Sequence, residues 1–503
     1  FATSPPHVVY YDIITDLQER RPLLMFRHRQ PSRHSHLSRG QINRLLPFTG
    51  APLFHALQLI ATGDSARFHM PGHKGEPLFN TYAEIFAIDF TETYGTGNLY
   101  TGEGPIRDAE VAAALYFGAS DCFFLTGGST QGIMSMLATA VGRGGSVLLD
   151  RECHKSVCHA CALLDITPYF VTAPLIEPFA VSGDLPLDAV ERQLIDHPDI
   201  KAVLVTSPTY YGVRRALPAL ADLCRAFDKR LLVDAAHGAH FPAVGLPAPI
   251  AEGADMAVLS MHKTLPCLGQ GAVILSAKGV DKRALRENTA LFGTSSPSYP
   301  IMASIDLARD YTEGKGRASY RRSAEACGEM REYVERRTGF TPLTPGHFPA
   351  LDPCRLTVCT AGTDVTGHQL SDMLWSEYGV ACEMADNRNA VFILTGADSA
   401  ASLHRLRRGL RRISNRRQET LPPSPASPFP PAERVMGVRD AWFSHTDRVE
   451  PAAAEGLVCA RPVTPYPPGV PLLWPGEKIT RAHIELIRER WYNEISEITV
   501  VIS

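Results

Sequence analysis

The feature that most constrains the fold of this chain is a regular alternation of short apolar runs and segments of helical length. Short apolar runs bounded by turn-forming residues are typical of buried parallel strands. Strands that alternate with helices build a mostly parallel sheet with helices on both faces. The predicted strands are Cys122–Thr126, Ser146–Asp150, Pro168–Val171, Ala202–Thr206, Leu231–Asp234, Met256–Leu259 and Ala272–Leu275. We therefore expect an α/β fold with a seven-stranded, mostly parallel sheet.

Two of these strands lead directly to chemically reactive side chains. Asp234 ends one apolar run, and Lys263 follows the next one. Open α/β sheets bind their ligands at the carboxyl ends of their strands. A buried lysine loses its proton readily and attacks carbonyl groups, as in the Schiff base with pyridoxal phosphate (PLP), and a carboxylate keeps the pyridine nitrogen of PLP protonated. Either residue alone is more often a surface group, but the combination favours a PLP site.

Another strand end carries small and hydroxylated residues. Gly128, Ser129 and Thr130 follow the strand Cys122–Thr126 and open the next predicted helix. A helix N-terminus presents free N–H groups and the positive end of a dipole, which suits a phosphate group. The alternative is that Ser129 only caps its own helix, and the residues alone leave both interpretations open.

His154 begins the helix that follows the strand Ser146–Asp150. An imidazole at this place can stack on a flat ring that enters the cleft at the strand ends. A single histidine is also often a capping or hydrogen-bonded polar group, so spacing alone does not decide its role.

Composition and charge exclude several classes of partner. The 503 residues carry a formal net charge of −3, which gives no reason to expect a nucleic acid partner. No apolar run is long enough to span a bilayer, so no membrane association is expected. The 11 cysteines are odd in number and scattered, which fits reduced thiols in the cytoplasm. His69 and His73 have the spacing of a helical metal pair, but Pro71 and Gly72 would break that helix, so we predict no metal site.

The chain divides into segments that differ in composition and in predicted secondary structure. Residues 1–47 are rich in His, Arg and Ser without sustained periodicity, and we expect them to be a disordered or spurious extension. The strand–helix alternation lies in a major domain, 48–335. Residues 336–417 mix predicted strands and helices as a smaller α+β domain. The proline-rich stretch 418–433 is expected to be an extended linker, and 434–503 form a C-terminal segment.

Five motifs occur together along the chain. They are Phe68–Gly75 (FHMPGHKG), Asp234–His240 (DAAHGAH), Ser260–Thr264 (SMHKT), Thr294–Tyr299 (TSSPSY) and Tyr466–Gly469 (YPPG). In this order they resemble the ornithine/lysine/arginine decarboxylase family of PLP enzymes, which has the aspartate-aminotransferase-like fold. The similarity runs from about Pro52 to the C-terminus, and the lack of a receiver-like wing domain resembles the short bacterial members. The chain departs from the family at Ala235, where an acidic residue is usual, and at Tyr211–Gly212, where an aspartate-glycine step is usual.

The resemblance implies roles for individual residues and makes 48–335 the PLP-binding domain. Lys263 is the lysine joined covalently to PLP, and Asp234 is the partner of the pyridine nitrogen. His154 stacks on the ring, and His237 lies near the phenolic oxygen of the cofactor and the reacting carboxylate. The remaining cofactor ligands, chiefly for the phosphate, are Gly128, Ser129, Thr130, Ser260, His262 and Ser295. Since Ser295 lies in the motif that reaches a neighbouring subunit, the resemblance also implies a homodimer or larger homo-oligomer with active sites at the subunit interface.

The expected reaction is PLP-dependent decarboxylation of arginine, lysine or ornithine to an amine and carbon dioxide. Lys263, His237 and Asp234 would be the catalytic residues, with either His237 or Lys263 returning a proton to the α-carbon. Glu477 is the candidate partner of the substrate's distal cation, and the alternative is a solvated glutamate in a turn. Two other functions stay open: a different PLP reaction, such as transamination or side-chain elimination, and a catalytically silent dimeric paralogue.

Overall fold

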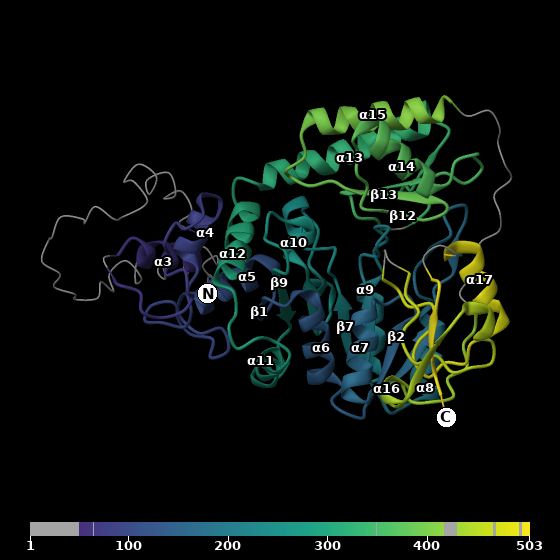
Figure 1. Cartoon of the computed structure of the whole chain (residues 1–503), viewed down its shortest axis with the longest axis horizontal. Coiled ribbons are helices and arrows are strands. Elements are labelled where there is room, and N and C mark those ends of the chain that lie inside the picture. The colour runs from purple at the N-terminus through teal and green to yellow at the C-terminus, as the bar shows by residue number, and fades with distance from the viewer. Residues whose placement is uncertain are drawn as a thin grey trace, which may run out of the picture.

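The computed structural model describes residues 50–63, 65–348, 350–416, 430–465, 469–491 and 495–502. Three segments considered above, namely 1–47, most of the 418–433 linker and Tyr466–Pro468 of the fifth motif, lie outside the described residues. Figure 1 shows the arrangement of the helices and strands.

A seven-stranded sheet forms the centre of the molecule, in the order β1-β9-β8-β7-β6-β2-β3. Its strands are β1 (Asp121–Leu125), β2 (Ser146–Asp150), β3 (Thr167–Val171), β6 (Ile200–Thr206), β7 (Arg230–Asp234), β8 (Met256–Leu259) and β9 (Ala272–Ser276). Neighbouring strands pair in parallel except at β9, which is antiparallel to both β1 and β8. The predicted α/β class and mostly parallel sheet are confirmed.

Helices cover both faces of this sheet because successive strand residues point to opposite sides. In β7, Leu231 and Val233 join one hydrophobic core and Leu232 joins the other. The first core is closed by α3 (Pro52–Ala61), α5 (Gly104–Phe117), α8 (Leu187–Asp196), α9 (Leu217–Ala226) and α12 (Tyr299–Glu313). The second is closed by α6 (Gly128–Ala140), α7 (Lys155–Leu164), α11 (Lys282–Leu291) and α16 (Val438–Phe443).

A second, smaller unit lies above the major domain in Figure 1. Its antiparallel sheet has the order β10-β11-β13-β12, formed by β10 (Thr341–Pro342), β11 (Arg355–Cys359), β12 (Met384–Ala385) and β13 (Asn389–Ile393). Its helices are α13 (Arg317–Arg337), α14 (Gly367–Tyr378) and α15 (Ala400–Ser414). α14 begins with a capping box in which the Thr366 hydroxyl accepts from the Gln369 N–H and the Gln369 side chain accepts from the Thr366 N–H. The smaller α+β unit expected after the major domain is thus present.

The remaining elements are short. They comprise α4 (Ala83–Ile88), α10 (Met261–Thr264), the hairpin β4 (Leu175–Ile176) and β5 (Val181–Ser182), α17 (Arg481–Trp491), and the pair β14 (Thr446–Val449) and β15 (Ile498–Val501). None of the described helices has the length and hydrophobicity that a bilayer-spanning segment needs.

Arg151 ties the C-terminal segment to the major domain. Its Nη1 donates to the carbonyl of Pro471 (3.0 Å), and its Nη2 donates to the carbonyl of Leu472 (2.9 Å) and to Glu477 Oε2 (3.3 Å). Glu477 also accepts from the Trp474 N–H at 2.7 Å. Both charged side chains are buried. Each therefore offsets the free-energy cost of burying the other's charge.

We expect Arg151→Met to lower the free energy of unfolding by about 3 kcal/mol, because it leaves the carboxylate of Glu477 buried without its cation. Urea unfolding followed by tryptophan fluorescence measures the change. The matched control is Arg283→Met, since the Arg283–Glu287 pair is solvent-exposed and contributes about 0.5 kcal/mol or less. Equal losses in the two variants would contradict the structural role of Arg151.

Candidate active site

Asp234 and Lys263 line the same cleft at one edge of the central sheet. β7 and β8 are parallel neighbours, with Asp234 opposite Val258 in the register. Asp234 is the last residue of β7, and Lys263 lies in α10 directly after β8. The carboxyl ends of adjacent parallel strands therefore bring the carboxylate and the amine together, as the sequence predicts.

Lys263 is surrounded by groups that affect its charge. Its Nζ lies 3.1 Å from Nε2 of His237. Burial lowers the pKa of Lys263 below its usual value, while the nearby carboxylates of Asp234 and Glu383 oppose this shift. The pKa of His237 is held well below its ordinary value by burial first, and then by the charges of Lys263 and Arg355. Burial therefore shifts Lys263 toward the free amine, which is the nucleophilic form.

Asp234 is a buried carboxylate with few partners. It is 5 % exposed, and Oδ1 accepts a hydrogen bond from the Ala236 N–H at 3.1 Å. Burial raises the pKa of Asp234, and Lys263 counteracts the rise. A cationic ring nitrogen beside it would favour the ionised form.

His154 both caps a helix and lines the cleft. Its Nδ1 accepts from the Ser156 N–H at the start of α7, which is one of the two roles considered for it. The ring also faces the cleft that holds Asp234 and Lys263. Burial lowers the pKa of His154 to about 4, so the ring is neutral at pH 7 and suits stacking on an aromatic group.

The predicted phosphate ligands come from two helix starts. Ser129 lines the cleft in the first turn of α6, beside Thr130. No side chain caps that helix, so Ser129 is not its cap. Ser260 precedes α10, and its buried Oγ has no hydrogen-bond partner among the described residues. His262 uses Nδ1 to contact the Gly271 carbonyl at 3.0 Å, which leaves Nε2 available.

Six predicted residues do not line the cleft, namely Gly128, Thr130, Ser260, His262, Ser295 and Glu477. Gly128 adopts a positive φ of 70° at the start of α6. Ser295 is exposed in the loop before α12. Glu477 is not at the cleft, because Arg151 and the Trp474 N–H hold it inside the C-terminal segment. Glu477 is therefore a structural carboxylate of that segment, and it is Val470 that reaches the cleft.

Sequence reasoning missed several residues at the site, among them Tyr210, Glu383 and Arg355. The ring of Tyr210 packs edge-on against His237, with 4.5 Å between the ring centroids. It follows the carboxyl end of β6, so the rule that identified Asp234 could also have found it. Glu383 and Arg355 belong to the smaller unit, where no strand end of the central sheet marks them.

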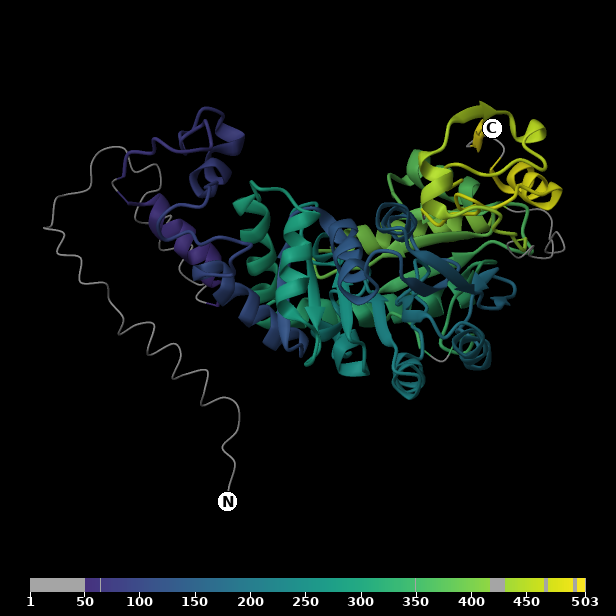
Figure 2. The ribbon, with the colours of Figure 1, turned by 90° about the horizontal axis from the view of Figure 1, so that it is seen from below.

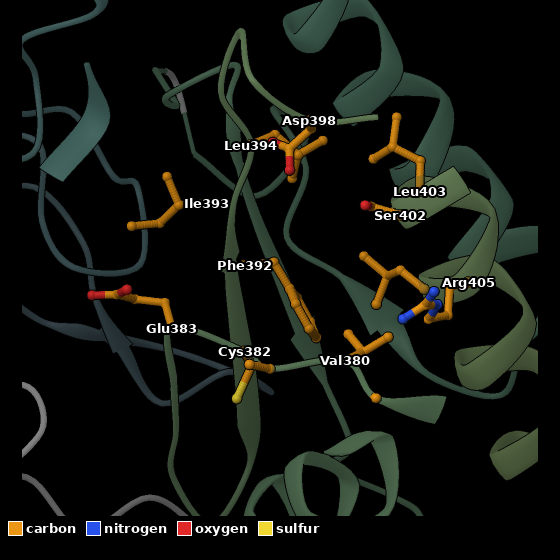
Figure 3. A pocket seen from close by; sticks show the side chains of 13 residues that line it. Val380, Cys382, Glu383, Phe392, Ile393, Leu394, Asp398, Ser402, Leu403 and Arg405 are labelled. Carbon is orange, nitrogen blue, oxygen red and sulfur yellow. The ribbon is translucent and has the colours of Figure 1, made fainter. Parts of the chain in front are cut away.

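Glu383 links the cleft to a cavity of about 360 Å³ in the smaller unit. Its Oε1 accepts a hydrogen bond from the Tyr210 hydroxyl at 3.1 Å. Figure 3 shows Glu383 at one edge of this cavity, on the side opposite Leu403 and Arg405. This cavity is larger than the cleft but holds no lysine or histidine, so the chemistry belongs to the cleft.

The residues present fit PLP. The buried, unpartnered hydroxyl of Ser260 and the uncapped start of α6 are suited to a phosphate. The cleft itself offers the neutral ring of His154, the carboxylate of Asp234 and the amine of Lys263. Each part of the cofactor thus has a complementary group.

Comparisons with known proteins match the chain to one family. Residues 51–349 match the Orn/Lys/Arg decarboxylase major domain, and residues 431–490 match the C-terminal domain of the same family. The chain is 30% identical to an arginine decarboxylase of Halalkalibacterium halodurans over 87% of its own length and 93% of that protein. Identity to an arginine decarboxylase of Bacillus subtilis is 29%, over 87% and 92% of the two chains.

Solved structures show the same fold. The crystal structure of a lysine decarboxylase from Francisella novicida superposes with a TM-score of 0.79 at 19% identity, covering 92% of this chain and 83% of that one. With the family's two domains matched and a PLP site in place, the chain belongs to the Orn/Lys/Arg decarboxylase family of PLP-dependent enzymes.

Proposed function

We propose that this protein decarboxylates a basic amino acid, and that its preferred substrate is arginine. The observation that carries the proposal is the cleft in which Lys263, Asp234 and His237 meet, with the carboxylate of Glu383 nearby. The arginine preference is supported by four relatives at 29–30% identity that are named arginine decarboxylases.

When bound, PLP supplies an electron sink for the bond between the α-carbon and the carboxylate. In this proposal Lys263 holds the cofactor, Asp234 keeps its ring nitrogen protonated, and the neutral ring of His154 covers one face. Ser129, Thr130, Ser260 and His262, with the Gly128 backbone, hold the phosphate. Ser295 joins the site from the neighbouring subunit.

Glu383 is our proposed partner for the distal cation of the substrate. Its negative charge opposes the lowering of the Lys263 pKa, and its Oε1 accepts a hydrogen bond from the hydroxyl of Tyr210, which lines the cleft. A guanidinium can make two parallel hydrogen bonds to one carboxylate. A substrate joined to the cofactor through its α-amino group and bound to Glu383 through its distal cation would be fixed at both ends. This would orient the bond that is broken.

The test is carbon dioxide release measured side by side with arginine, lysine and ornithine, with the amine product identified by mass spectrometry. We expect carbon dioxide and the amine product in equal amounts, with the fastest release from arginine. A keto acid product would point to transamination instead. A protein that stays colourless with added PLP and releases no carbon dioxide would support the silent paralogue.

We further propose that the enzyme is a homodimer or larger, in the cytoplasm. Phe68 and Tyr94 are 94% and 93% exposed, and an apolar surface of this kind usually marks an interface. These residues belong to the N-terminal part of the described chain, which is drawn in purple at one end of the molecule in Figure 2. The unpaired state of all 11 cysteines supports a reducing compartment.

Sedimentation equilibrium tests the assembly. We expect a dimer mass for the PLP-bound protein and a shift toward monomer for Phe68→Asp combined with Tyr94→Asp, with carbon dioxide release lost in parallel. The matched control is Leu187→Asp, which changes a 40% exposed residue on a different element, α8. A fully active monomer would contradict the proposed interface.

A further inference from the structure

Arg355 reaches from the smaller unit into the active site. It is the first residue of β11 and is 2% exposed. Its Nη2 lies 3.2 Å from Nδ1 of His237, whose Nε2 lies 3.1 Å from Nζ of Lys263. The three side chains form one row of hydrogen bonds that ends at the reactive amine.

The donors and acceptors of this row allow one arrangement. A guanidinium has donors only and stays charged, so Nδ1 of His237 must accept. The single hydrogen of a neutral imidazole then sits on Nε2 and points at Lys263. Since Nε2 donates, Nζ must accept, and only the neutral amine has a lone pair for this. An imidazolium at His237 would place a donor against Arg355, and an ammonium at Lys263 would place a donor against Nε2–H.

We propose that Arg355 is a positioning residue that fixes the Nε2–H tautomer of His237 and thereby holds Lys263 as the free amine that captures the cofactor. In this state the hydrogen on Nε2 is the only one on the nitrogens of His237, and Nζ of Lys263 presents its lone pair.

The surrounding structure holds Arg355 in place. Nη2 of Arg331, on α13, donates to the carbonyls of Asp352 (2.9 Å) and Arg355 (2.6 Å). Gly212 has a φ of 94°, and a Cβ there would lie 2.7 Å from the Cβ and Cγ of Arg355. Nε and Nη1 of Arg355 have no hydrogen-bond partner among the described residues. The carboxylate of Asp352, with Oδ2 3.8 Å from Nε, supplies a buried counter-charge to Arg355, while Nη2 is left to face His237.

Other charges near the row raise or lower the pKa of Lys263. Asp234 and Glu383 favour the ammonium form of Lys263, whereas burial and the charge of Arg355 favour the amine. The ring of Tyr210 lies 5.9 Å from Nζ and also favours the cation. His154 and His240 face His237 and add to the lowering of its pKa. Arg355 differs from all of these because it fixes which nitrogen of His237 carries hydrogen.

The first test is nitrogen-15 solid-state NMR of the full chain labelled in histidine, with PLP removed and again with PLP bound. Histidine nitrogen resonances report which ring nitrogen carries hydrogen, and His237→Gln identifies the signal. We expect the Nε2–H tautomer alone in the unchanged protein, a mixture of tautomers in Arg355→Met, and the Nε2–H tautomer again in Arg355→Lys, which restores a charged donor.

The second test is the rate at which the PLP-free chain forms its covalent bond with PLP, followed by absorbance across a pH series. If Arg355→Met raises the pKa of Lys263 by about one unit, the pH profile of the rate moves about one unit to higher pH. Arg355→Lys should return the profile most of the way. Arg336→Met is the control, because it removes an arginine from the exposed Arg336–Glu332 pair on α13 without touching Arg355 or His237, and it should leave the profile in place.

An Nδ1–H tautomer in the unchanged protein, or an unshifted profile in Arg355→Met, would overturn the inference. These measurements need no amino acid substrate. They are therefore independent of which amino acid is decarboxylated, so a failure here is distinguishable from a failure of the proposed function.

Discussion

Lys263→Ala is expected to lower carbon dioxide release by at least about 10⁴-fold, since removal of a residue that forms a covalent catalytic bond costs this much or more. The amine is the only one that lines the cleft, so within the described residues no neighbour can replace it. Release of carbon dioxide from arginine by the purified, PLP-saturated variant measures the loss.

Lys282→Ala is the control, because Lys282 is exposed at the start of α11 and lies away from the cleft. It should retain full activity. Borohydride reduction followed by peptide mass spectrometry adds a second readout: the PLP adduct should sit on Lys263 in the unchanged protein and disappear in the variant. Undiminished carbon dioxide release by Lys263→Ala would exclude the mechanism.

Glu383→Gln is expected to lower kcat/KM for arginine about 100-fold, because the cation of the substrate loses its charged partner in a partly desolvated site. The loss should be small for an aliphatic amino acid such as norleucine, which has no distal cation. Steady-state kinetics with both substrates gives the ratio, and a collapse of the preference for arginine is the expected result.

Tyr210→Phe separates the charge of Glu383 from its hydrogen bond. This variant removes only the Tyr210 hydroxyl that donates to Glu383, so we expect a loss of about tenfold or less. If Glu383→Gln left the preference for arginine over norleucine unchanged, the distal cation would have to bind elsewhere.

The central sheet and the two reactive residues at its edge were predictable from the sequence. Each predicted strand is present, and its ends differ by two residues at most. This success has a local cause: buried parallel strands are short apolar runs, and the residues that follow them lie at one edge of the sheet. Asp234 and Lys263 therefore follow from chain order alone.

The residues supplied by the smaller unit did not follow from chain order. Arg355 and Glu383 reach the site because the four-stranded sheet packs against the major domain, and this packing depends on the shapes of both surfaces. Glu477, by contrast, was predicted to bind the substrate but does not line the cleft. It lies in the segment that does approach the cleft, but the buried cation of Arg151 binds its carboxylate first. A single sequence does not reveal such competition between partners.

The contacts of the C-terminal segment have a consequence for biosynthesis. The Lys155 N–H, at the start of α7, donates to the carbonyl of Gly469, and Val470 lines the cleft. A premature stop codon before Gly469 would remove these contacts and also Trp474, which is buried in the second core. In such a shortened chain the cleft loses one wall, and the buried cation of Arg151 loses the carboxylate of Glu477.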